Sequence, residues 1–131
     1  MRENEISGLV LDTCIRIHRV LGPGLFESVY EEVLCYELKR SGLAVDRQRL
    51  VPIQYESVRL KAGFRADLIV ENKVLLELKS VEILHPVHKM QVLTYLKLTH
   101  LHLGLLINFN VRLMKEGFHR IVNGLQETPS I

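Results

Sequence analysis

The stretch that decides the fold is Phe64-Arg65-Ala66-Asp67-Leu68-Ile69-Val70, followed after a short gap by Leu75-Leu76-Glu77-Leu78-Lys79-Ser80. Both segments are mostly apolar, and the pair Glu71-Asn72 between them is typical of a tight turn. We therefore predict two antiparallel strands joined by this turn, one from about Arg59 to Val70 and the other from Lys73 to Val81.

The charged side chains of these strands are the candidate site. Side chains alternate between the two faces of a strand, so Glu77 and Lys79 share one face while Leu76 and Leu78 share the other. Pairing across the turn places Asp67 roughly opposite Glu77. Two carboxylates this close repel each other, and a divalent cation relieves the repulsion. Magnesium prefers such oxygen ligands and keeps several waters, which leaves room for a substrate phosphate.

A structural ion pair beside a sheet edge is the alternative interpretation of the same residues. A Glu-x-Lys triplet is common in proteins, and burying its charges requires only that each has a partner. The combination favours a functional site, because Asp67 lies ahead of the triplet on an apolar strand and a helix follows it.

Two helices and a further strand are predicted ahead of these strands. Apolar residues recur at helical spacing from Ile6 to Leu21 and from Glu27 to about Arg40. Gly22-Pro23-Gly24 separates these helices. A strand is predicted from Val45 to Tyr55, with its odd-numbered residues all pointing to one side.

After the two central strands in the chain, we predict a helix from Pro86 to about Thr99 and a buried strand from Leu101 to Phe109. A short β excursion is expected from Arg112 to Val122, and then a polar tail from about residue 124. The order is helix, helix, three strands, helix, strand, so the fold class is mixed α/β. The whole chain, residues 1–131, is predicted to form a single domain.

Composition limits the class of protein without naming a function. The chain has 131 residues, of which 47% are apolar and 24% charged, as in an ordinary globular protein. No apolar run approaches the roughly 18–20 residues of a membrane span, and the polar N-terminus is unlike a signal peptide. Cys14 and Cys35 fall in apolar helical patterns and are expected to be reduced core residues. We therefore expect a cytoplasmic protein, and the net charge of +2 neither requires nor excludes a nucleic-acid partner.

Further polar residues follow on the predicted third helix. Gln91 and Tyr95 are spaced i and i+4 and share one helix face. On such a face a glutamine is more often a surface residue and a tyrosine more often core. The histidines, among them His85 and His88, lack the i, i+4 spacing of helical zinc ligands, so zinc binding is not favoured.

Taken together, these residues resemble the PD-(D/E)xK nuclease superfamily. Asp67 matches its metal-binding aspartate and Glu77-Leu78-Lys79 its (D/E)xK element, although Ala66 stands where the motif has proline. Gly63 to Ile69 followed by Gln91 to Tyr95 looks like the version in nuclease domains of bacterial recombination helicases. The resemblance covers roughly residues 27–110. It implies a restriction-endonuclease-like core of helix, three-stranded antiparallel run, helix and strand, with an extra N-terminal helix.

A narrower resemblance lies upstream, where Gly24-Leu25-Phe26-Glu27-Ser28-Val29-Tyr30 is similar to the signature of the small GxxExxY proteins. It implies that Glu27 adds a helix-borne acid to the metal site. The alternative is that Glu27 favours a helix N-terminus through the dipole while Tyr30 packs in the core. Glu31 and Glu32 are expected to be solvated.

The resemblance also implies a function and a role for each residue. The chain is expected to hydrolyse phosphodiester bonds of nucleic acid, DNA in the first place, as an endonuclease or exonuclease. Asp67, Glu77 and the backbone carbonyl of Leu78 would bind Mg²⁺ or Mn²⁺, and Lys79 would orient the attacking water. Further expected site residues are Gln91, which would position the lysine or a phosphate, and the substrate contacts Tyr95, Arg65, Lys89, Arg47 and Arg49. Other classes stay open, namely a non-catalytic binding module on the same fold and a homodimerisation domain.

Overall fold

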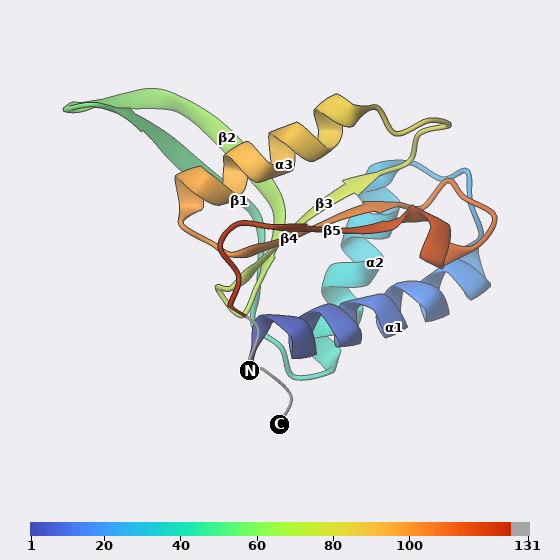
Figure 1. The fold of residues 1–131 in the computed structure, drawn as a ribbon. Helices are drawn as coiled ribbons and strands as arrows, with labels where there is room; N and C mark the ends of the chain where they lie inside the picture. Colours follow the sequence, from blue (N-terminus) through green and yellow to red (C-terminus); the bar gives the residue numbers. More distant parts are fainter. Residues whose placement is uncertain (127–131) are drawn as a thin grey trace.

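A computed structural model of the chain describes residues 1–126, so the last part of the predicted polar tail lies outside the described residues. A five-stranded sheet runs in the order β1-β2-β3-β4-β5 through the centre of the molecule (Figure 1). Its strands are β1 (Val45–Tyr55), β2 (Val58–Val70), β3 (Val74–Lys79), β4 (Leu103–Asn108) and β5 (Phe118–Val122). The helices are α1 (Glu3–Leu21), α2 (Glu27–Arg40), α3 (Pro86–Thr99) and the short 3₁₀ helix η1 (Met114–Gly117).

The sheet is mixed, which confirms the predicted α/β class and the restriction-endonuclease-like core with its N-terminal helix. β1, β2 and β3 form an antiparallel run, β4 lies parallel to β3, and β5 returns antiparallel to β4. The predicted excursion from Arg112 to Val122 is a strand only over its last five residues, because the chain first turns through η1.

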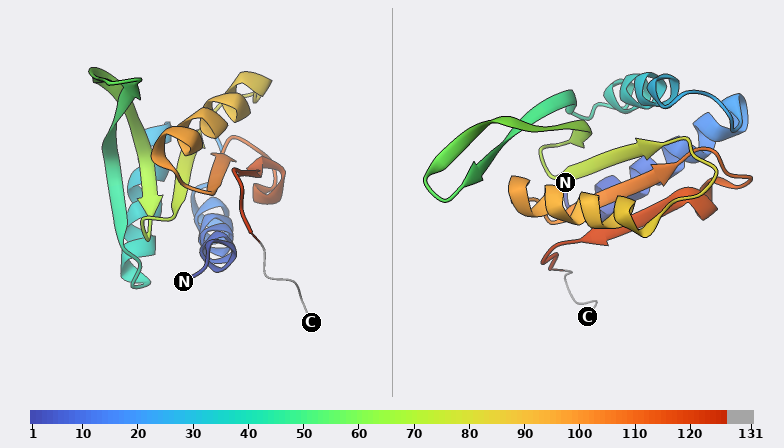
Figure 2. Two further views of the ribbon diagram at one scale, coloured as in Figure 1. Left: turned by 60° about the vertical axis from the view of Figure 1, so that its left-hand side comes forward. Right: turned by 90° about the horizontal axis from the view of Figure 1, so that it is seen from above.

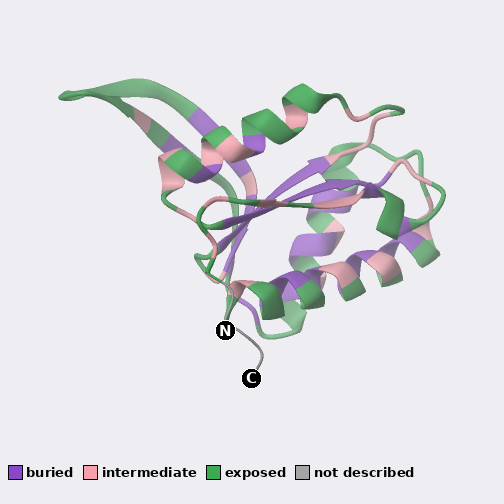
Figure 3. Cartoon of the chain, in the orientation of Figure 1, coloured by how far each residue is buried: buried purple, intermediate pink, exposed green. Residues whose placement is uncertain are grey.

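Helices cover both faces of the sheet. α1 and α2 pack on one face and α3 on the other, as the turned views show (Figure 2). Buried residues follow the sheet and the inner faces of the helices (Figure 3). On the α1–α2 side the core includes Tyr30, whose ring stacks on Phe109 with centroids 4.3 Å apart. Cys14 and Cys35 are free and buried in that core, as expected.

The predicted breaks between elements are confirmed. Gly22 ends α1 with a φ of 71°, a conformation that glycine adopts without strain. Between β2 and β3, Glu71 and Asn72 both have a φ of 54°. Two consecutive left-handed residues are the mark of a type I′ turn, whose twist matches that of a hairpin.

The strict alternation predicted for β1 is wrong. Val45 packs in the core beneath α1 and α2, whereas Val51 packs beneath α3, although both are odd-numbered. Gln48 lies between them with a φ of 54° inside the strand. Because this left-handed residue rotates the chain, Val45 before it faces α1 and α2 while Val51 after it faces α3.

The hairpin of β1 and β2 extends well beyond the rest of the sheet, toward the upper left of Figure 1. β2 pairs with β3 only from Leu68 to Val70, while its pairing with β1 continues outward to Val58. β2 and β3 therefore separate just before Leu68 and form a fork, and Asp67 lies at that point. Among residues 1–126, no helix is long and apolar enough to span a membrane.

Candidate active site

Asp67 and Glu77 meet at the fork between β2 and β3. The Asp67 carboxylate accepts a hydrogen bond of 2.9 Å from the backbone N–H of Leu78, and the backbone N–H of Asp67 donates to the Glu77 carboxylate. Leu76 and Leu78 pack beneath α1 and α2, so Glu77 and Lys79 lie on the opposite face of β3, as predicted.

Burial and mutual repulsion disturb the protonation of both acids. Glu77 is only 7% exposed, and this burial, strengthened by the charge of Asp67, raises its pKa to about 8. Burial also raises the pKa of Asp67, although the hydrogen bond from Leu78 opposes the rise. A pair of buried carboxyls that resists double ionisation is a site that gains from binding a cation.

Lys79 provides part of the positive charge needed to offset the two carboxylates. Its Nζ lies 4.0 Å from a carboxylate oxygen of Glu77, at the limit of an ion pair, and the side chain is largely buried. The ammonium lowers the pKa of Glu77 and of Asp67, but burial outweighs this effect at both acids. The site therefore holds two carboxyls and one cation in a region from which much of the water is excluded.

A third acid, Glu31 on α2, is linked to Asp67 through Gln48. The side-chain amide of Gln48 donates hydrogen bonds to both Glu31 and Asp67, the latter at 3.3 Å. Glu31 is 6% exposed and Arg47 donates to it at 2.8 Å, so the prediction that Glu31 is solvated is wrong. The spacing of Glu31 from Glu27 was an available indication, because residues four apart share a helix face.

Glu27 faces the same site from the start of α2. Its carboxylate accepts a hydrogen bond of 3.4 Å from the backbone N–H of Ser80, the residue after Lys79, and its charge raises the pKa of Glu77. The Ser80 hydroxyl donates to the carbonyl of Leu25 at 2.6 Å. The loop ahead of α2 is thus attached to the end of β3, and this attachment places Glu27 near the acid pair.

Tyr30 fixes the other end of that loop. Its hydroxyl donates to the carbonyl of Gly22 at 2.6 Å and accepts from the backbone N–H of Leu25 at 3.1 Å. The glycine, glutamate and tyrosine of the upstream motif therefore have different tasks. Gly24 turns with a φ of 96°, Tyr30 anchors the loop from the core, and Glu27 is turned to the site.

α3 brings Gln91 and Tyr95 over the same face. The Gln91 side chain hydrogen-bonds to Tyr95, and the Tyr95 ring stacks on Phe64 of β2 with centroids 3.7 Å apart. Burial and then the charges of Glu77 and Asp67 raise the pKa of Tyr95. His88, one turn before Gln91, has its pKa lowered first by burial and then by Lys79.

The expected substrate contacts divide into two groups. Arg65 lies close to the site, where it donates to the backbone carbonyl of Gln48 at 3.2 Å. Arg47 is held by Glu31, and Arg49 bonds Asn72 and Asp46 near the β2–β3 turn. Lys89 lies beside His119 of β5, where its charge lowers the pKa of that histidine. Of these four cations, the structure brings only Arg65 and the paired Arg47 toward Asp67.

The donor set suits a hard cation that keeps water ligands. Within residues 1–126, no three His, Cys, Asp or Glu side chains are grouped so that they could hold a metal ion by themselves. Asp67 and Glu77 supply oxygens from two strands. The N–H and C=O of one strand residue point to the same edge, so the Leu78 carbonyl faces the fork together with the N–H that bonds Asp67. Magnesium tolerates such a partial set because waters and phosphate complete its shell.

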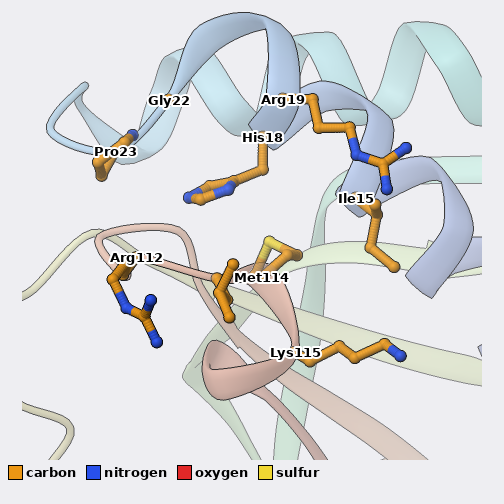
Figure 4. A pocket seen from close by; sticks show the side chains of 9 residues that line it. Ile15, His18, Arg19, Gly22, Pro23, Arg112, Met114 and Lys115 are labelled. Carbon is orange, nitrogen blue, oxygen red and sulfur yellow. The ribbon is translucent and has the colours of Figure 1, made fainter.

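A separate pocket of about 410 Å³ lies between the end of α1 and η1. His18 and Met114 point into it, with Arg19, Arg112 and Lys115 at its margin (Figure 4). The His18 ring bonds the carbonyl of Val111 at 2.9 Å. None of its lining residues is acidic, so the pocket lacks oxygen ligands for a hard cation and does not compete with the fork as a metal site.

The model of the PD-(D/E)XK nuclease superfamily matches residues 4–121 of the chain. The chain belongs to this superfamily. PD-(D/E)XK proteins are in general nucleases that use divalent metals, so the superfamily supports a nuclease-type function and a nucleic-acid substrate. Comparisons with curated proteins and with solved structures gave no match.

Proposed function

We propose that this chain is a metal-dependent nuclease that hydrolyses phosphodiester bonds, with DNA as its substrate and Mg²⁺ or Mn²⁺ as its cofactor. The observation that carries the proposal is the buried pair of Asp67 and Glu77 with Lys79 beside it. The upstream Gly-x-x-Glu-x-x-Tyr motif supports a place among the GxxExxY proteins, because each of its three residues has a distinct task in the loop beside the site.

Each residue has a proposed role. Asp67, Glu77 and the carbonyl of Leu78 hold the cation, and Glu27 lies close enough to Ser80 and Glu77 to serve a second cation. A bound divalent ion lowers the pKa of water and offsets charge on the phosphate. Lys79 orients the attacking water and stabilises negative charge as it develops on the phosphate. Gln91, held by Tyr95, positions a phosphate oxygen from the α3 side.

A non-catalytic binding module on the same fold is the competing proposal. Such a module has no need for a pair of buried carboxyls that destabilise each other. The three side chains also give a direct test, because their roles differ. Asp67→Asn and Glu77→Gln remove charge that attracts the cation, so both metal affinity and cleavage are expected to fall.

Lys79→Met separates catalysis from metal binding. It keeps most of the apolar stem and removes the charge. We expect cleavage to fall by about 10²–10³ while metal affinity stays equal or rises, because a repelling cation has gone. Calorimetry of Mn²⁺ binding and a cleavage assay on plasmid and linear DNA measure both quantities. Glu5→Gln, an exposed change on α1, is the matched control. Normal cleavage by Lys79→Met, or unchanged metal affinity in Asp67→Asn, would contradict the assigned roles.

A further inference from the structure

The outer part of the β1–β2 hairpin, residues 53–63, is here called the arm. It lies beyond Val51 and Phe64, the last hairpin residues that pack beneath α3. The other arm residues are exposed, and only Ile53 is partly covered. A ribbon that contributes almost nothing to either core, and that extends from the sheet beside the site, calls for a role outside folding (Figure 2).

The two faces of the arm differ in character. Phe64 packs toward α3, so Gly63 belongs to the opposite face. The register pairs Gly63 with Pro52 and Arg59 with Gln54, which places Arg59 on that opposite face as well, and Lys61 lies between them where the register shifts. Arg65 continues the basic row toward the site, where it bonds the carbonyl of Gln48. Within the described residues no ion pair joins Arg59 or Lys61 to an acid, and Glu56 at the tip is the arm's one acidic residue.

The basic row begins at Arg65, which bonds the backbone of Gln48, the residue whose side chain bonds Asp67. Arg65 is two residues from Asp67, and Lys61 and Arg59 follow outward along the same strand. At about 3.3 Å per residue, Arg59 lies roughly 20–26 Å along the hairpin from Asp67, the shorter length being counted along β1, where Gln54 pairs with Arg59. That is the length of about six to eight base pairs of B-form DNA. The unpaired edge of β2 faces the same fork, since β3 pairs with β2 only from Leu68 onward.

We infer that the arm is a clasp for duplex DNA, which holds the phosphate backbone on one side of the cleavage position through Arg59, Lys61 and Arg65. This inference rests on the proposed function. A two-stranded ribbon fits the major groove of B-form DNA, whereas the major groove of A-form RNA is too narrow to admit it. The substrate class that follows is a DNA duplex extending at least about six to eight base pairs beyond the cut.

Binding and cleavage are measured separately, so that the clasp and the proposed activity can fail independently. The probe is a fluorescent DNA duplex of roughly 24 base pairs, titrated in EDTA at several salt concentrations. Arg59→Gln/Lys61→Gln is expected to weaken binding about tenfold and to reduce the slope of log affinity against log salt by about 1.8, two phosphate contacts' worth. Lys39→Gln/Lys115→Gln is the control with the same charge change, on α2 and η1.

Each outcome decides one proposal. A clasp requires that the arm variant loses affinity, that the control does not, and that a duplex of about six base pairs shows no difference between them. Equal behaviour of the two variants, or tighter binding of duplex RNA, would overturn the clasp while DNA cleavage by the wild type left the nuclease proposal intact. If only the arm variant lost binding, and the wild type cleaved DNA with none of the metals tested, the clasp would be supported and the proposed nuclease activity would be contradicted. A wild-type dimer that dissociates on Leu60→Ser would assign the arm to a second copy of the chain.

Discussion

Glu77 illustrates how a single residue links the metal to the stability of the fold. Its pKa of about 8, raised by burial and by Asp67, leaves the carboxyl largely protonated at neutral pH when no cation is bound. An acid whose pKa is higher in the folded chain than in the unfolded one binds its proton more tightly when folded. Ionisation of Glu77 therefore destabilises the fold, and stability is lost as the pH rises from the ordinary value of 4.5 through about 8.

We accordingly expect the melting temperature of the protein in EDTA to fall between about pH 6 and about pH 9. Glu77→Gln removes the ionisation and should reduce that fall by roughly 5 °C or more, whereas Glu5→Gln should leave it unchanged. Calorimetric scans across the pH range measure the effect. If the melting temperature of the wild type and of Glu77→Gln fell by the same amount over this pH range, Glu77 would not be held in its neutral form.

Single residues of the site also show which positions can be predicted from the sequence and which cannot. The shared face of Glu77 and Lys79 follows from the strand period alone, because β3 is regular. The contact between Gln48 and Asp67 does not follow, since it depends on a left-handed residue that is not glycine. The burial of Glu31 follows only in part, because its spacing from Glu27 places both acids on one face of α2. Its bonds with Arg47 and Gln48 depend on how α2 packs against β1, which no local pattern gives.

Among the elements, the loop between α1 and α2 has a structural task that belongs to the site. Tyr30→Phe removes the hydroxyl that bonds Gly22 and Leu25 and leaves the partly buried carbonyl of Gly22 without this donor. We expect a loss of about 1–2 kcal/mol in the free energy of unfolding, together with a loss of activity, because the loop carries Glu27. Tyr36→Phe is the control, since Tyr36 is exposed on the same helix. Chemical denaturation measures the first effect, and a wild-type cleavage rate in Tyr30→Phe would show that the anchor is structural only.

The hairpin of β1 and β2 has its own weak point at Gly63. A Cβ at this position would lie 2.1 Å from the carbonyl oxygen of Val51, which is backbone and cannot move without breaking the strand pairing. Gly63→Ala is therefore expected to destabilise the protein by more than about 1 kcal/mol and to loosen the arm. Gly8→Ala on α1 meets nothing within 4 Å and should instead stabilise by about 0.5–1 kcal/mol, because alanine favours a helix. Urea unfolding distinguishes the two, and stability changes of the same sign would contradict this account.

For the whole molecule, one sheet serves two cores and one site. The cluster beneath α1 and α2 and the cluster beneath α3 share the strands β2, β3 and β4 between them. Asp67 and Glu77 lie on two of these strands, so an ion bound to both would hold together elements on which both cores depend. We therefore propose that the chain unfolds as one domain and that metal binding is transmitted to its global stability.

The final prediction uses this linkage. A ligand that binds only the folded chain at about ten times its dissociation constant stabilises the fold by ~1.4 kcal/mol. For a chain of this length, that is a rise of roughly 3–6 °C in melting temperature. The rise should be larger at about pH 8.5 than at about pH 6.5, because the cation must displace the proton on Glu77. It should vanish in Asp67→Asn and persist in Lys79→Met. Thermal scans with Mg²⁺, Mn²⁺ or EDTA measure it, and a rise that is independent of pH and retained in Asp67→Asn would place the cation elsewhere on the molecule.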